Sequence, residues 1–183
     1  EEYLLYMTWY EANAERVNAA MQAYLGISLM SLPTGDLWGG WIGDMDWQGS
    51  GTESEPYQIT SLAELMGLSE LVASGVAFED YYFELTNDID LGSIEINSGN
   101  WNPIGWYQNA SELNGTVSNT FKGHLDGADN TISGLKIVNK SQNLRNVGLF
   151  GAIEGGSIKN LVIEAEDVYG TDNVGILAGT ISG

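Results

Sequence analysis

Paired carboxylates are the residues whose types and spacing come nearest to a reactive site in this sequence. Asp88 and Asp90 are two residues apart, and Asp126 and Asp129 flank a predicted turn. Two carboxylates at a set separation can act as the acid and the base of glycoside hydrolysis. A polysaccharide lyase would also need a basic residue, and the chain has only 6 Lys and Arg. We therefore assign no catalytic residue and expect a protein that is not an enzyme.

The same kind of residue is a candidate ligand for calcium, a cation that prefers oxygen ligands. Asp88 and Asp90 fall on one face of a predicted strand, because side chains alternate along a strand. Asp44 and Asp46 have the same spacing. Asn-Asp and Asp-Gly pairs are also ordinary at turns. Calcium, with Asp88 and Asp90 as the first candidates, is the one cofactor that the sequence suggests.

The chain holds one histidine and no cysteine, which limits the other kinds of site. His124 lies between Gly123 and Leu125, without the second histidine of a metal site or the spacing of a Ser–His–Asp triad. Without cysteine there is no disulfide, no iron–sulfur cluster and no thiol nucleophile. We predict that His124 lies at a turn or on the surface and has a structural role.

The charge of the chain is strongly one-sided. Its 183 residues include 25 Asp and Glu but only 6 Lys and Arg, for a net charge of −19. Binding to nucleic acid or to anionic lipid requires clustered Lys and Arg, so neither is an expected partner. No apolar run reaches the roughly 18 residues of a membrane-spanning helix, and we predict no membrane insertion.

Two further groups of side chains could mark points of attachment. Asn109, Asn114 and Asn139 each begin an Asn-x-Ser/Thr sequon and are candidate glycosylation sites, although chance also explains three sequons in a chain of this composition. Six aromatic residues could stack on sugar rings, and we favour packing inside the fold for them: Trp38, Trp41, Trp47, Trp101, Trp106 and Tyr107.

The elements that position these residues fall into two segments, with a boundary near Asp46. Residues 1–46 are predicted to be an N-terminal helix followed by a linker rich in Gly and Trp. The start of this helix is apolar nearly all round, which is unusual for a surface helix. Leu5, Trp9 and Tyr10 lie there, and we expect them to contact the rest of the chain, another subunit or a preceding domain.

Residues 47–183 are predicted to be mainly β, with one capping helix. Ser61 and Glu64 form a capping box for a helix over about residues 61–74, and Gly75 is its expected stop. From Tyr82 onward, short alternating runs separated by Gly and Asn are typical of strands and turns. We expect strands at residues 57–59, 83–85, 87–91, 121–125, 131–132, 135–138, 147–150, 157–158 and 161–163.

Two strand-and-turn patterns recur with nearly the same period. Residues 132–137 resemble residues 158–163, a shift of 158 − 132 = 26, and residues 147–151 resemble residues 174–179, a shift of 174 − 147 = 27. A period of this length indicates a solenoid, whose stacked repeats share one core. Because the repeat contains strands and no helix, the sequence predicts a parallel β-helix with coils of about 26–27 residues.

Gly148-Leu149-Phe150-Gly151 resembles the motif that names the GLUG family of repeat proteins, and the segment from Gly175 to Gly179 resembles a degenerate next copy. Residues 51–59, 82–91, 101–105 and 121–127 also resemble parts of such domains, so that the resemblance covers about residues 49–183. It implies a right-handed parallel β-helix in a secreted or cell-surface protein of bacteria or archaea, often one module of an adhesin-like chain. The family motif carries over no catalytic residue.

These observations predict a non-enzymatic extracellular structural or adhesion module. Its expected partners are other copies of itself or further domains of a larger chain, and assembly into a filament is one form that this could take. Glycans are also candidate partners. A carbohydrate-active β-helix enzyme and a carbohydrate-binding module that uses the tryptophans are the two alternatives.

Overall fold

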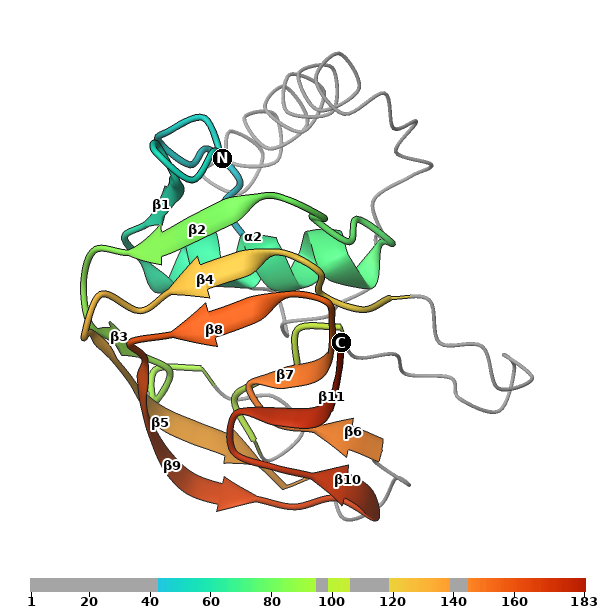
Figure 1. Ribbon diagram of the computed structural model, residues 1–183. Helices are drawn as coiled ribbons and strands as arrows, with labels where there is room; N and C mark the ends of the chain where they lie inside the picture. The colour runs from blue at the N-terminus through green and yellow to red at the C-terminus, as the bar shows by residue number, and fades with distance from the viewer. Residues whose placement is uncertain (1–42, 95–98, 106–118, 139–144) are drawn as a thin grey trace, which may run out of the picture. The chain divides into compact units, whose positions relative to one another are not determined.

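The computed structural model describes residues 43–94, 99–105, 119–138 and 145–183. The described residues form one helix and a series of short strands (Figure 1). In chain order they are β1 (Tyr57–Ile59), α2 (Leu62–Ala73), β2 (Tyr82–Leu85), β3 (Ile89–Asp90), β4 (His124–Asp126), β5 (Thr131–Ile137), β6 (Arg145–Val147), β7 (Phe150–Glu154), β8 (Ser157–Lys159), β9 (Val162–Val168), β10 (Asp172–Val174) and β11 (Ala178–Ser182). The predicted N-terminal helix, with Leu5, Trp9 and Tyr10, lies outside the described residues.

The pairings between these strands are all parallel. They form a sheet in the order β1-β2-β4-β8, a second in the order β3-β5-β9, and two pairs, β10-β6 and β11-β7. In Figure 1, β2, β4 and β8 lie side by side and point in the same direction. The prediction of a mainly β protein built from short strands is confirmed.

The order in which the chain visits the sheets explains why every pairing is parallel. From β4 the chain passes through β5, β6 and β7, one strand in each sheet or pair. It then passes through β8, β9, β10 and β11, which pair with the same four strands in the same order. Two parallel strands that are neighbours in a sheet need a long connection between them. Here that connection is the stretch of chain that forms strands in the other sheets.

The strand register matches one of the two predicted shifts and contradicts the other. Val147 pairs with Val174, which is the predicted shift of 27. Ile132, however, pairs with Ile163 and not with Ile158, so its shift is 163 − 132 = 31. Ile158 lies in β8 and pairs with Leu125 of β4, at a shift of 158 − 125 = 33. The segments around Ile132 in β5 and Ile158 in β8 both alternate apolar and polar residues. A comparison of side-chain patterns alone therefore matched two strands that belong to different sheets.

Unequal connections are the physical reason for the changing shift. The connection from β5 to β6 runs from Ile137 to Arg145, whereas the matching connection from β9 to β10 runs only from Val168 to Asp172. Loops at the surface tolerate such differences in length at small cost. The strands therefore pair in the same order, although the number of residues between register partners changes from one pair of strands to the next.

Helix α2 begins and ends where its capping residues predict. Ser61 is the N-cap, and its Oγ accepts a hydrogen bond from the Glu64 N–H at 3.3 Å. The reciprocal half of the capping box differs, because Glu64 Oε2 accepts from the backbone N–H and the hydroxyl of Thr60, at 2.6 and 2.7 Å. At the other end, Gly75 N–H donates to Val72 and Val76 N–H donates to Leu71, the two bonds of a Schellman motif.

The core contains a row of aromatic rings contributed by successive parts of the chain. Phe83, Phe121 and Phe150 are fully buried. The ring centroids are 6.2 Å apart for Phe83 and Phe121 and 5.2 Å apart for Phe121 and Phe150. Trp47 packs on Phe83 at 5.3 Å, and its Nε1–H donates to the Glu64 carbonyl. Trp101 is also buried, so the prediction of packing is confirmed for these two tryptophans, while Trp38, Trp41, Trp106 and Tyr107 lie outside the described residues.

Glu70 on α2 should make the stability of the fold depend on pH. Burial raises its pKa to about 7, against the weaker opposing effect of a hydrogen bond from the Gly43 N–H to its Oε1. The folded chain therefore holds this proton more tightly than the unfolded chain, in which the pKa is 4.5. Stability from this group is complete below pH 4.5 and is lost as the pH rises to about 7.

Replacing Glu70 by glutamine is expected to remove this loss. We expect E70Q to be more stable than the original chain by roughly 1–3 kcal/mol at pH 8, and to differ little from it at pH 4. Urea unfolding at the two pH values measures the difference. Glu79→Gln, at an exposed position, is the matched control and should change neither value. Equal effects of E70Q at both pH values would contradict the assignment.

Candidate functional site

The outward face of the β1-β2-β4-β8 sheet carries a group of polar side chains that the strand register brings together. The strand register places Tyr82, His124 and Ser157 in one row across β2, β4 and β8. Glu84, Asp126 and Lys159 form the next row. The residues between these rows, such as Phe83 and Leu125, are buried, because side chains alternate between the two faces of a strand. We call these six residues the polar face: Tyr82, Glu84, His124, Asp126, Ser157 and Lys159.

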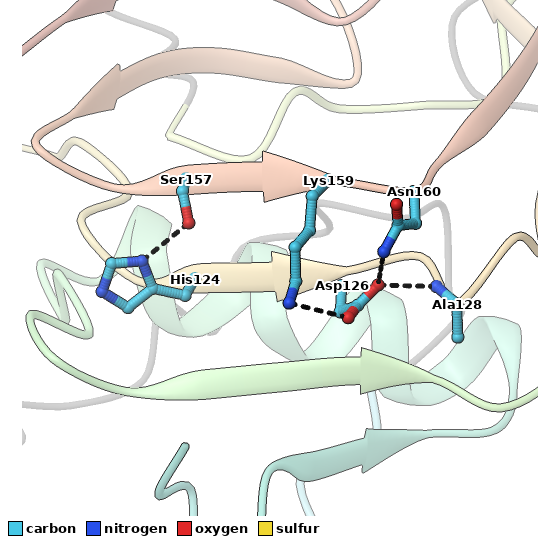
Figure 2. Close-up of polar contacts among 6 residues, drawn as sticks. All are labelled: His124, Asp126, Ala128, Ser157, Lys159 and Asn160. Atoms are coloured by element: carbon cyan, nitrogen blue, oxygen red, sulfur yellow. Dashed lines mark hydrogen bonds and ion pairs between the residues drawn. The ribbon is translucent and has the colours of Figure 1, made fainter.

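His124 and Ser157 form a direct contact on the polar face. The His124 Nδ1 and the Ser157 Oγ are 2.8 Å apart. Figure 2 draws this contact between the two strands. The imidazole ring also stacks on the phenol ring of Tyr82, with centroids 4.5 Å apart. The two residues of the Ser–His contact are 33 positions apart in the sequence, so only the strand register could have revealed this contact.

Asp126 is held by three donors beside this pair. Its Oδ1 accepts from the Ala128 N–H at 2.9 Å and from the Asn160 amide at 3.0 Å, and its Oδ2 is 3.0 Å from Lys159 Nζ (Figure 2). The Ala128 hydrogen bond is the main cause that lowers the pKa of Asp126, and the hydrogen bond from Lys159 adds to it. The bond to Asp126 in turn raises the pKa of Lys159.

The contacts of the polar face join neighbouring strands. A serine hydrolase needs a carboxylate on the far side of the imidazole to orient it. Here both oxygens of Asp126, the acid that follows on the same strand, are engaged by Ala128, Asn160 and Lys159. The His124–Ser157 and Asp126–Lys159 contacts join β4 to β8, and the Asp126–Asn160 hydrogen bond joins β4 to the residue after β8. The surface role predicted for His124 agrees with this arrangement.

Cations elsewhere in the described residues occupy similar positions between neighbouring strands. Arg145 Nε is 3.1 Å from Asp172 Oδ2, and these two residues are register partners. Lys122 Nζ is 3.4 Å from Glu154 Oε1. Lys136 has Asp167 as its register partner. The basic residues within the described ranges thus lie where they reduce repulsion between adjacent strands.

The predicted calcium ligands Asp88, Asp90 and Asp44 each accept a backbone hydrogen bond. Asp88 Oδ1 accepts from the Thr131 N–H at 2.7 Å, which joins the start of β3 to the start of β5. Asp90 Oδ1 accepts from the Gly92 N–H at 2.8 Å, and Asp44 Oδ1 accepts from the Asp46 N–H at 3.0 Å. Among the described residues, no three His, Cys, Asp or Glu side chains gather closely enough to hold a metal ion. Calcium binding at Asp88 and Asp90 stays a prediction from the sequence.

The residues of the Gly-rich motif form close backbone contacts between the β4–β7 and β8–β11 segments. Gly148 and Leu149 lie between β6 and β7, where the chain passes from one sheet to the next. A Cβ added to Gly148 would lie 2.6 Å from the Gly175 carbonyl oxygen, which leaves no room for a side chain. Gly151 and Gly179 both pack against the backbone of Asn146. The three predicted glycosylation sites Asn109, Asn114 and Asn139 lie outside the described residues.

An asparagine pair that the sequence analysis missed lies beside this motif. Asn146 and Asn173 both have left-handed backbones, with φ of 54° and 53°. The Asn173 side-chain amide donates to Asn146 Oδ1 at 2.8 Å, and the Thr180 hydroxyl donates to the same oxygen at 3.0 Å. The signal was available, because Asn-Val-Gly occurs at both 146–148 and 173–175.

The β8–β11 segment leaves apolar side chains exposed at positions that are buried in the segment before it. Val147 is fully buried and its partner Val174 is 46% exposed. Ile153 is 3% exposed and its partner Ile181 is 64% exposed. Each of β8, β9, β10 and β11 also lies at the edge of its sheet or pair. We call this surface the outer edge and define it by three side chains: Val174, Ile176 and Ile181.

Comparison with known proteins finds two relatives of modest similarity. Over 135 residues, 73% of this chain, it is 36% identical to a protein named "Halomucin" from Haloquadratum walsbyi, and it spans 1% of that protein. Over 137 residues, 74% of this chain, it is 32% identical to a protein named "Putative Gly-rich membrane protein" from Evansella cellulosilytica, and it spans 14% of that one. No family model and no solved structure matches the chain. None of the helices in its described part is long and apolar enough to cross a membrane. The chain is thus similar to a small part of two much longer proteins.

Proposed function

We propose that this chain is a non-enzymatic structural module of a large extracellular or cell-surface protein, built as a right-handed parallel β-helix. In this proposal β4–β7 and β8–β11 are successive coils of one stack. The ordered, parallel pairing of these two sets of strands is the observation that carries it. A right-handed path is expected because connections between parallel strands are right-handed in nearly all proteins.

Three features of the molecule support a structural role. The contacts of the polar face join neighbouring strands, and the Asn146–Asn173 pair does the same at a corner. The aromatic core is continuous from Trp47 to Phe150. The net charge of −19 gives the chain a strongly solvated surface, which helps to keep a β protein with open strand edges soluble.

Location at the cell surface is supported by what the two relatives are called. One name denotes a mucin-like protein and the other a membrane protein, and both are far longer than this chain. Further domains of a longer chain are therefore the partners that we propose, with glycans as a second class.

Labelling of intact cells tests this function. An antibody raised against residues 43–183 should label the organism that encodes the chain without permeabilisation, in contrast to an antibody against a cytoplasmic protein of the same cells. Labelling that appears only after permeabilisation would contradict the proposal.

The absence of catalysis is tested separately with acidic and neutral polysaccharides, in the presence and in the absence of calcium. We expect no turnover above that of a heat-denatured sample. Turnover that disappears in Asp88→Asn or His124→Ala would contradict the non-enzymatic role.

A further inference from the structure

We infer that the outer edge is the docking surface for a further coil of the same polypeptide, whose strands add in parallel to β8, β9, β10 and β11. This inference rests on the proposed function and names the partner of the stack. The occupant is defined by chemistry: a segment with apolar side chains opposite Val174, Ile176 and Ile181, and with an asparagine and glycines at the corner.

The outer edge repeats a surface of the preceding segment whose occupant is seen in the structure. The β4–β7 segment presents Asn146, Val147 and Gly148 to the β8–β11 segment, which covers them. The β8–β11 segment presents the same three residue types outward as Asn173, Val174 and Gly175. A surface with the same side chains in the same register fits the same kind of partner.

The outer edge also leaves apolar side chains in water that the preceding segment buries. The Leu149 N–H donates to the Ile176 carbonyl at 2.9 Å, and Leu149 is fully buried, whereas Ile176 is 52% exposed. Ile181 and Val174 show the same contrast with their partners. Exposed strand edges with apolar side chains pair readily with further strands. One more coil would bury these side chains. It would also continue the stacks of apolar side chains that begin with Val147 in β6 and Ile153 in β7.

A covalently continuous coil fits the outer edge better than a second copy of this chain does. A second copy would have to offer a matching parallel edge from its first strands. In the described residues, the free side of β1 is taken by Gln48, which forms an antiparallel bridge with Gln58 and accepts its N–H at 2.8 Å. On the side of β7 away from β11, Ile104 forms a parallel bridge with Phe150, and Phe121 forms one with Ile153. The two relatives are much longer than this chain, and a linked coil docks at a high effective concentration.

Adding one coil to the full chain tests the inference. A variant that carries a copy of residues 156–182 after Gly183 places Asn, Val and Gly opposite Asn173, Val174 and Gly175. The matched control has the same extension, with lysine in the copied positions of Val174, Ile176 and Ile181. In hydrogen exchange followed by mass spectrometry, peptides from β10 and β11 should exchange at least about 10-fold more slowly in the first variant than in the control.

A second measurement keeps the test decisive if the extension folds poorly. Ile176→Thr combined with Ile181→Thr should change the unfolding equilibrium constant less than about 5-fold in the 183-residue chain, because both side chains are largely exposed. In the extended chain the same pair should change it by more than about 30-fold, because both side chains are then buried.

Three results would overturn the inference. One is equal exchange in the two extended variants, and another is equal effects of the threonine pair with and without the extension. The third is a stable dimer of the 183-residue chain in sedimentation, dispersed by Ile181→Lys, which would assign the outer edge to a second copy. Surface labelling of intact cells is independent of all three, so failure of this inference can be told from failure of the proposed function.

Discussion

Replacing Phe121 by alanine is expected to lower the free energy of unfolding by about 3–5 kcal/mol. Phe121 is fully buried, and its ring lies between those of Phe83 and Phe150. Its backbone also joins neighbouring parts of the chain, since its N–H donates to Ala152 and its carbonyl accepts from Glu154, both at 3.0 Å. Removing the ring leaves a cavity that parallel strands on both sides cannot easily close.

Guanidinium unfolding followed by tryptophan fluorescence measures the effect. Val162→Ala removes apolar atoms from a side chain that is 48% exposed and is the matched control. It should lower the free energy of unfolding by less than about 1 kcal/mol. An F121A variant that is no less stable than V162A would show that the aromatic row does not form the core.

Replacing Gly67 by alanine is expected to lower the free energy of unfolding by about 2 kcal/mol, although alanine is the better helix former. Gly67 lies inside α2, and a Cβ there would overlap the carbonyl oxygen of Asp44. Gly43 approaches the same turn of the helix, and an added Cβ on it would lie 2.6 Å from the Gly67 Cα. Residues 43–44 must therefore move away when a methyl group is added.

A second readout connects this variant to Glu70. Displacement of residues 43–44 admits water to the Glu70 carboxylate, so that the loss of stability between pH 4 and pH 8 should be smaller in G67A. Gly92→Ala is the control, because its Cβ would meet only the flexible Asp90 side chain, at 3.0 Å. A G67A variant as stable as the original chain, with an unchanged pH dependence, would contradict the close approach of residues 43–44 to α2.

Local signals in the sequence predicted the elements of the fold well. Ser61 and Gly75 bound α2 as expected, because caps depend only on residues within one or two turns. The pairing of Val147 with Val174 was also predicted, since both lie in the same short Asn-Val-Gly segment. Alternation of apolar and polar residues found most of the strands for the same local reason.

Contacts between distant residues were beyond the reach of those signals. The pairing of Ile132 with Ile163 depends on the lengths of the connections in between, which no periodic pattern records. The contact of His124 with Ser157 follows from the register of β4 with β8, and so it also required the structure. Asp88 and Asp90 could be placed on a strand, but their backbone partners Thr131 and Gly92 could not be foreseen.

Disulfide formation between register partners tests the central claim, that successive sets of parallel strands stack as coils of unequal length. The chain has no cysteine, so any engineered pair reports on itself alone. Adjacent strands lie about 4.8 Å apart, within the range that a disulfide spans. The two test pairs are H124C with S157C, 33 residues apart, and R145C with D172C, 27 residues apart. The control pair is H124C with I158C, whose side chains point to opposite faces.

We predict that mild oxidation links both test pairs and leaves the control pair reduced, as shown by intact mass and by peptide mapping. Linkage of the control pair, with both test pairs reduced, would contradict the stacked arrangement on which the proposed function depends.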